Sequence, residues 1–202
     1  EIVRIYGAIG GVPAYLDKWD AAKSFKDNIC RLVLTPSGAL YGEADAVISA
    51  ELRELSAYST ILAAIARGEN KLNDIFHATG FSRAKISVYL KNLAAFNIVE
   101  KVVSFETGGW ENAKKGVYQI KDTFVNFWFK FVYPNMSNLY LLSPEEFYDT
   151  YIEKELDAYL ERYFREVCTE YLLILNQMGQ LPFTIKRVGT WIGKTGRIDI
   201  VA

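Results

Sequence analysis

The sequence contains one histidine and two cysteines among 202 residues, and this scarcity excludes several kinds of site. His77, Cys30 and Cys168 lie far apart and show no metal-ligand spacing, so we expect no metal or cofactor to be held by this chain. One histidine also leaves no set of nucleophile, base and acid to argue for. We therefore expect that the chain is not an enzyme by itself, and that both cysteines are small buried hydrophobic residues.

Long apolar runs and an excess of charge are also missing. No stretch approaches 18 uninterrupted apolar residues, and the N-terminal EIVRIYGAIGG has neither a basic leader nor a small-residue cleavage site. Half of the residues are hydrophobic and 14% are aromatic, which is typical of a folded protein. We expect a cytoplasmic protein without membrane contact. The net charge of −1 argues against strong nonspecific nucleic-acid binding by the whole chain.

Residues 56–121 show the clearest pattern, three helical blocks followed by two short alternating runs. Gly68 and Gly80 suit the ends of the first two helices, and Ser82 suits the N-cap of the third. The runs VEKVVSF and GVYQI alternate as strands do. This order predicts a winged helix-turn-helix. That fold most often places its third helix in the DNA major groove, but it also serves as a protein-interaction module.

The predicted third helix has basic and polar side chains away from its apolar stripe. Residues 67–121 hold nine basic and five acidic side chains, a local net charge of +4. Arg and Lys reach phosphates or guanine edges, while Ser and Tyr hydrogen-bond the DNA backbone. The candidate DNA contacts are Arg83, Lys85, Ser87, Tyr89 and Lys91 on the helix and Lys114 and Lys115 at the tip of the wing. The alternative is a solvated helix face in a module that packs against its neighbours.

The segments on either side are predicted to be mainly helical. Residues 124–133 form an aromatic stripe at helical spacing that favours a core helix, and residues 145–177 read as one long or broken helix before two short strands. We expect a mainly α fold with a small β component: a helical lid-like segment (1–55), a winged helix (56–121), and a linker helix with an incomplete C-terminal α/β domain (122–202). Since two strands with an open edge do not finish a domain, we expect the sequence to be part of a longer protein.

Three blocks of sequence together resemble one family. They are YGAIGGVPAYL, GVYQIKDTFVNFWFKFVYPN and VGTWIGKTGRIDIVA, in that order. They resemble the C-terminal half of the archaeal-type AAA+/STAND ATPases, multidomain NTPases with a nuclease-like C-terminal domain. The resemblance implies that GGVPAYL lies in the lid after a nucleotide-binding core. That core, with its ATP and magnesium, would be an upstream domain of the same protein; the resemblance leaves oligomerisation open.

The resemblance also implies a restriction-endonuclease-like C-terminal domain. Such folds use a helix Glu, a strand Asp and a Glu-x-Lys on the next strand to hold a metal and activate water. Asp199 matches the strand Asp and Glu166 is the best match to the helix Glu, although Arg165 stands where an acid is expected. The Glu-x-Lys strand would follow Ala202, so the resemblance implies no complete nuclease site in this chain.

The sequence GTWIGKTG near the C-terminus looks like a phosphate-binding loop but does not fit one. Three residues rather than four separate its first two glycines, and a strand-like run follows where a helix is required. We interpret it as a hairpin turn. Three hypotheses therefore stay open for the chain: a DNA-binding winged helix, a protein-docking module, and part of a nuclease-like domain.

Overall fold

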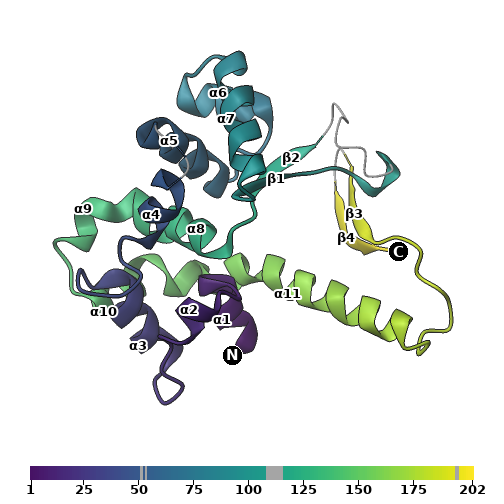
Figure 1. Cartoon of the computed structure of the whole chain (residues 1–202), viewed down its shortest axis with the longest axis horizontal. Coiled ribbons are helices and arrows are strands. Elements are labelled where there is room, and N and C mark those ends of the chain that lie inside the picture. Colours follow the sequence, from purple (N-terminus) through teal and green to yellow (C-terminus); the bar gives the residue numbers. More distant parts are fainter. Residues whose placement is uncertain (51, 53, 108–115, 194–195) are drawn as a thin grey trace.

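A computed structural model of the chain describes residues 1–50, 52, 54–107, 116–193 and 196–202. The molecule is mainly helical with two small antiparallel sheets, each of two strands (Figure 1). The helices are α1 (Ile2–Ile9), α2 (Pro13–Leu16), α3 (Phe25–Ile29), η1 (Cys30–Leu34), α4 (Glu43–Ser49), α5 (Leu55–Ala66), α6 (Leu72–Thr79), α7 (Arg83–Ala95), η2 (Phe105–Thr107), α8 (Thr123–Phe127), η3 (Trp128–Val132), η4 (Tyr133–Asn135), α9 (Met136–Leu139), α10 (Pro144–Tyr151) and α11 (Glu153–Gln177). The strands are β1 (Val99–Val102), β2 (Val117–Ile120), β3 (Gly189–Ile192) and β4 (Arg197–Val201).

Helices from the N-terminal segment and from the segment after the β1–β2 hairpin form one helical body. In it α1 packs against α8 and α11, while α10 packs against α3, η1 and α11. Glycine allows this close approach, because a Cβ on Gly7 would lie 2.4 Å from Cδ2 of Leu160. The Tyr159 hydroxyl donates to the Gly7 carbonyl oxygen at 2.9 Å and fixes the same contact. Residues 1–49 and 123–163 therefore share one core.

The aromatic segment from Phe124 to Val132 lies at the centre of this core, which confirms the predicted core helix. Its α-helical part, α8, continues as the π-helical η3, and Phe127, Trp128 and Phe131 are each at most 1% exposed. The Phe127 ring lies 5.1 Å from the Phe131 ring, measured between centroids, and 6.0 Å from the Tyr159 ring. A run of large side chains at helical spacing thus packs against helices on several sides.

The helices α5, α6 and α7 and the β1–β2 hairpin form a second unit, here called the helix–hairpin unit, in the predicted order. Gly80 ends α6 in the left-handed region at φ 71°, and the Ser82 hydroxyl accepts from the Lys85 amide at 3.2 Å to cap α7. The strands are in register from Val99 opposite Ile120 onward. These local signals explain why the unit was predictable from sequence.

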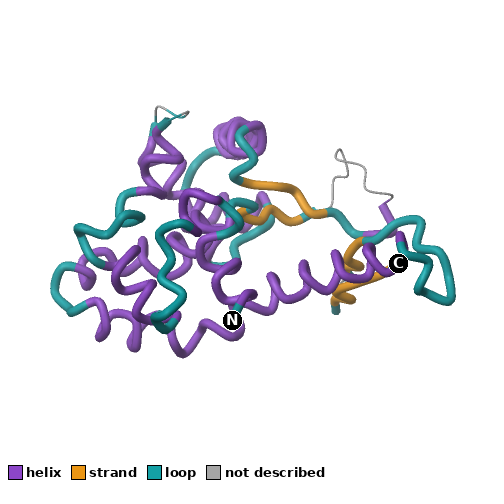
Figure 2. Tube along the Cα trace, turned by 60° about the horizontal axis from the view of Figure 1, so that its bottom comes forward, coloured by secondary structure: helices purple, strands orange, loops and turns teal. Residues whose placement is uncertain are grey.

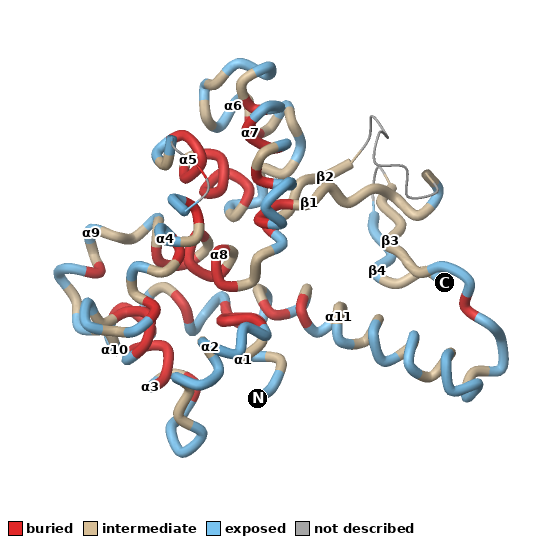
Figure 3. Tube along the Cα trace, in the orientation of Figure 1, coloured by how far each residue is buried: buried red, intermediate tan, exposed pale blue. Residues whose placement is uncertain are grey.

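The last part of the described chain differs from the prediction in two respects. Residues 183–193, where the first of the two C-terminal strands is expected, form a strand only over β3 (Figure 2), and the apolar side of the long helix is buried only in its first half. Leu156, Leu160 and Tyr163 are buried, but Phe164 and Tyr171 are each 60% exposed. The reason is that α11 extends beyond the helical body, where fewer elements cover it (Figure 3). In the described part of the chain, no helix is both long and apolar enough to cross a membrane.

A buried polar side chain, Asn28, joins the loop before α3 to the helix itself. Asn28 is fully buried; its Oδ1 accepts from the Asp20 amide at 2.9 Å, and its Nδ2 donates to the carbonyl oxygens of Asp20 (2.9 Å) and Ser24 (3.1 Å). We predict that Asn28→Leu lowers the free energy of unfolding by about 2–3 kcal/mol, because it removes the side-chain hydrogen bonds of a buried residue and leaves the half-buried Asp20 amide without that partner. Urea denaturation measures this. Gln177→Leu on the exposed surface is the control and should change stability by less than about 0.5 kcal/mol.

Candidate nucleic-acid interface

The side of α7 that faces away from the core is exposed and free of acidic residues. Five of its exposed residues are here called the α7 face: Arg83, Ala84, Ser87, Val88 and Lys91. The opposite side packs Ile86, Tyr89, Leu90 and Leu93 into the core. The positive charges of the α7 face are those of Arg83 and Lys91. No Asp or Glu occurs between Arg83 and Ala95, so no acidic residue of the same helix neutralises them.

Arg83 is held in place where α6 meets α7. Its Nη2 donates to Oδ1 of Asn73 at 2.5 Å, and its guanidinium carbon lies 4.1 Å from the centre of the Phe76 ring. Ser87 donates to the Arg83 carbonyl oxygen at 2.8 Å, which leaves its own oxygen able to accept. Lys91 is exposed, and within the described residues it has no ion-pair partner. The predicted contacts Arg83, Ser87 and Lys91 therefore share one open surface.

Tyr89 does not lie on this surface, contrary to the prediction. Its side chain is 8% exposed, its hydroxyl donates to Glu54, and its ring centroid lies 4.4 Å from that of Tyr58. The hydrogen bond to Glu54, together with burial, raises the pKa of Tyr89 to about 12. The spacing could have shown this, because Tyr89 stands three residues after Ile86 and four before Leu93 on the apolar stripe.

The other predicted contacts fall to the edge of the interface or outside the described residues. Lys85 is half-buried, with its Nζ 4.5 Å from the centre of the Phe81 ring and 5.3 Å from that of Tyr89. It therefore lies beside the α7 face and not on it. Lys114 and Lys115 lie outside the described residues.

Two residues of the α7 face were missed by the sequence interpretation. Ala84 and Val88 follow one another at a spacing of four on the side opposite the core, and Val88 is 56% exposed. Small apolar side chains let a helix backbone approach closely and can contact the methyl group of thymine. The sequence signal for this position was an apolar residue, Val88, that lies outside the apolar stripe of the helix.

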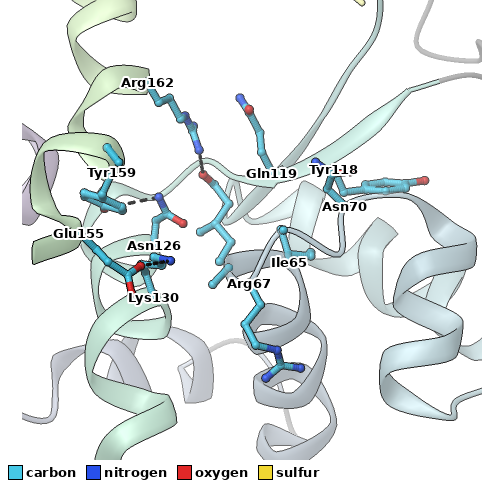
Figure 4. A pocket seen from close by; sticks show the side chains of 14 residues that line it. Ile65, Arg67, Asn70, Tyr118, Gln119, Asn126, Lys130, Glu155, Tyr159 and Arg162 are labelled. Carbon is cyan, nitrogen blue, oxygen red and sulfur yellow. Dashed lines mark hydrogen bonds and ion pairs between the residues drawn. The ribbon is translucent and has the colours of Figure 1, made fainter. Parts of the chain in front are cut away.

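A cavity of about 380 Å³ lies where the helix–hairpin unit meets the helical body (Figure 4). Its cations are engaged with partners: Arg162 donates to the Ile120 carbonyl oxygen at 2.7 Å, and Lys130 pairs with Glu155 at 2.7 Å. Arg67, which also lines the cavity, points away from the others (Figure 4). Because Arg162 and Lys130 are already paired and Arg67 points away, this cavity is better suited to holding the hairpin against α11 than to binding an anion.

The two nuclease-like candidates are both held by arginines. Glu166 accepts from Nε of Arg162 at 2.9 Å. Asp199 pairs with Arg165 of α11 and with Nε of Arg197 at 2.8 Å. Among the residues that the structure describes, no three His, Cys, Asp or Glu side chains gather where they could hold a metal ion. Arg165, which stands where an acid was expected, forms an ion pair with Asp199 and so connects α11 to β4.

Comparison with known proteins finds a family profile that matches part of the chain. Residues 128–202 match the sequence profile of DUF234, described as "Archaea bacterial proteins of unknown function". The whole chain is 33% identical over 203 residues to "Uncharacterized protein MJECL04" of Methanocaldococcus jannaschii. The chain spans only 44% of the length of that relative. No solved structure matches the chain.

The match agrees with one part of the expected resemblance. The C-terminal portion, from η3 through β4, is similar to a domain family found in archaea and bacteria, and the aligned relative is archaeal. Neither comparison names a substrate, a nucleic acid or a reaction. The function therefore has to be argued from the exposed surfaces of the molecule.

Proposed function

We propose that residues 55–120 form a winged helix that binds duplex DNA through the α7 face. The arrangement of α5, α6, α7 and the β1–β2 hairpin supports the winged-helix assignment. A further support is the bond from the Tyr118 amide to the Asn70 carbonyl oxygen at 2.7 Å, which adds the α5–α6 connection to the edge of β2.

The single observation that supports DNA binding most directly is the open, acid-free α7 face. Arg83 and Lys91 are eight residues apart, which is about 12 Å along a helix. Cations so spaced can contact phosphates at different points of the groove while Ala84 and Val88 approach the base edges between them. The prior positioning of Arg83 by Asn73 and Phe76 lowers the entropy lost on binding.

We further propose that this winged helix belongs to a longer cytoplasmic ATPase resembling the archaeal-type AAA+/STAND enzymes. The greater length of the archaeal relative supports a protein with more domains than this chain describes. ATP and magnesium would bind in a separate upstream domain of that protein. The arginine pairing of Glu166 and Asp199 gives no support to nuclease chemistry by this chain.

A second function, docking to a protein, has one observation in its favour. Val88 is 56% exposed and lies with Ala84 in the middle of the α7 face, so this part of the surface is apolar. Apolar surface surrounded by a few charges is also what a protein partner buries. The two functions differ in salt dependence, because only DNA binding releases counterions from a phosphate backbone.

We predict that the chain binds a labelled duplex of about 20 base pairs at low salt and releases it as salt rises. Two or three phosphate contacts give a slope of about −2 to −3 in a plot of log K against log salt concentration. Fluorescence anisotropy between roughly 50 and 200 mM salt measures the slope. Absence of binding near 50 mM salt would remove the DNA proposal and leave protein docking.

A further inference from the structure

The second half of α11 presents a continuous apolar stripe to solvent. The stripe, here called the α11 seam, consists of Phe164 (60% exposed), Val167 (40%), Tyr171 (60%), Ile174 (51%) and Met178 (62%). Met178 is the residue directly after the helix. At 1.5 Å per residue the seam is about 21 Å long. Single exposed apolar residues are ordinary, but five in one row on one helix mark an interaction surface.

The two hairpins contact the other side of this helix. Arg162 reaches back to Glu100 of β1 and to the Ile120 carbonyl oxygen, and Arg165 pairs with Asp199 of β4. These arginines lie on the side of α11 that faces the two hairpins. The seam therefore points away from the hairpins, and in the views of Figures 1 and 3 this part of α11 projects from the helical body.

The spacing of the seam favours another helix as its occupant. The five residues follow one another at intervals of three, four, three and four. This alternation is the pattern of a coiled-coil seam, where each side chain fits between four residues of a facing helix. The seam is two heptads long, which is enough to receive a helix of similar length but not enough by itself for a large dimer interface.

The charges beside the seam favour a basic helix. Glu161 lies on one flank of the seam and Glu170 on the other, and both are exposed. The basic residues of this part of α11, Arg162 and Arg165, are engaged in ion pairs. A second copy of α11 placed antiparallel would bring Glu170 close to its own counterpart, which is repulsive. A partner helix with Lys or Arg at the flanking positions pairs with both acids instead.

We propose that the α11 seam docks an amphipathic α-helix of a partner protein, one with an apolar seam and basic flanking residues. The seam provides the buried contact and the two glutamates select the charge of the partner. This interaction is independent of DNA binding, because the α7 face and the α11 seam belong to different units.

Two designed peptides of three heptads test the proposal. Both have Leu at the seam positions, and the flanking positions are Lys in one and Glu in the other, so that like charges keep each peptide from pairing with itself. We expect the Lys peptide to bind the chain at least about tenfold more tightly than the Glu peptide, a difference of about 1.4 kcal/mol. Isothermal titration calorimetry measures both affinities.

Cys168 provides a second readout, because it lies on the flank of the seam between Val167 and Tyr171 and is partly exposed. Bound Lys peptide should slow its alkylation by iodoacetamide. Cys30 serves as the internal reference, since it is 4% exposed and burial raises the pKa of its thiol to about 12.

Two variants decide the outcome. Ile174→Glu should abolish binding of the Lys peptide without changing the unfolding midpoint, because Ile174 is already exposed. Glu161→Lys with Glu170→Lys should reverse the preference in favour of the Glu peptide. Equal affinity for the two peptides, or a failure of the double variant to reverse it, overturns the proposal. Sedimentation equilibrium showing a dimer that Ile174→Glu dissociates overturns it too, in favour of a second copy.

Discussion

Replacing Phe127 by alanine is expected to lower the free energy of unfolding by about 3–5 kcal/mol. Phe127 has no exposed surface, and its ring contacts those of Phe131 and Tyr159. The loss combines the transfer of the ring to water with a cavity that the rigid surroundings do not fill. A domain of this size has about 5–15 kcal/mol of stability in total, so the variant should lose a large fraction of it.

The effect should reach both units of the molecule. Helix α8 packs against α1 in the helical body, and η3, which continues it, packs against α5 of the helix–hairpin unit. Urea denaturation followed by circular dichroism and by tryptophan fluorescence should therefore show a common shift of the midpoint. If the two probes separate instead, the units unfold independently and the shared core is less important than the packing indicates.

Phe164→Ala is the matched control, because it removes the same side chain from a position that is 60% exposed. It should change stability by less than about 0.5 kcal/mol. A similar cost for Phe127→Ala and Phe164→Ala would contradict the placement of Phe127 at the centre of the core. The comparison also tests the α11 seam, since a seam residue covered by the chain itself would cost as much as a core residue.

The helix–hairpin unit was predictable because its signals are local. The cap Ser82, the left-handed Gly80 and the period of the apolar residues in α7 each act over a few positions. The aromatic core segment was predictable for the same reason. Such signals define where helices begin and end and which side of each helix is apolar.

The packing of distant segments was not predictable in this way. Nothing near Gly7 in the sequence indicates that Leu160 and Tyr163 will lie against it. The apolar stripe of α11 is continuous from Leu156 to Met178, yet only its first half meets other elements of the chain. Periodicity identifies an apolar side of a helix but not the element that covers it.

The candidate site was predictable only in part. Arg83, Ser87 and Lys91 lie on the exposed side of α7 as expected, because they fall between the positions of the apolar stripe. Tyr89 was misplaced because an amphipathic side chain is compatible with either side, and here packing against Tyr58 and a hydrogen bond to Glu54 decide its position. The partner of Glu166, Arg162, lies four positions away on α11, but Asp199 on β4 pairs with the distant Arg165 of α11 as well as with its neighbour Arg197. Only the fold shows which of these pairs form.

Reversing both charges of the α7 face, by Arg83→Glu with Lys91→Glu, is expected to weaken duplex binding by about 100-fold or more. Each contact of this kind contributes about 1–3 kcal/mol, and 1.4 kcal/mol is a factor of ten. The reversal also replaces attraction by repulsion at both positions. Both side chains are exposed, so the fold should be retained. Fluorescence anisotropy in about 50 mM salt measures the affinity where the phosphate contacts are strongest.

The control is Lys18→Glu with Lys23→Glu, which changes the net charge by the same amount on exposed residues of the N-terminal segment. This variant should weaken binding by less than about threefold, because exposed charges beyond the Debye length, about 14 Å at 50 mM salt, are largely screened. Equal weakening by the two double variants would show that DNA senses only the overall charge, and α7 would then have no special role. If neither variant changes the affinity, the α7 face is not the DNA contact. The exposed apolar residues Ala84 and Val88 would then favour a protein as the partner of the α7 face.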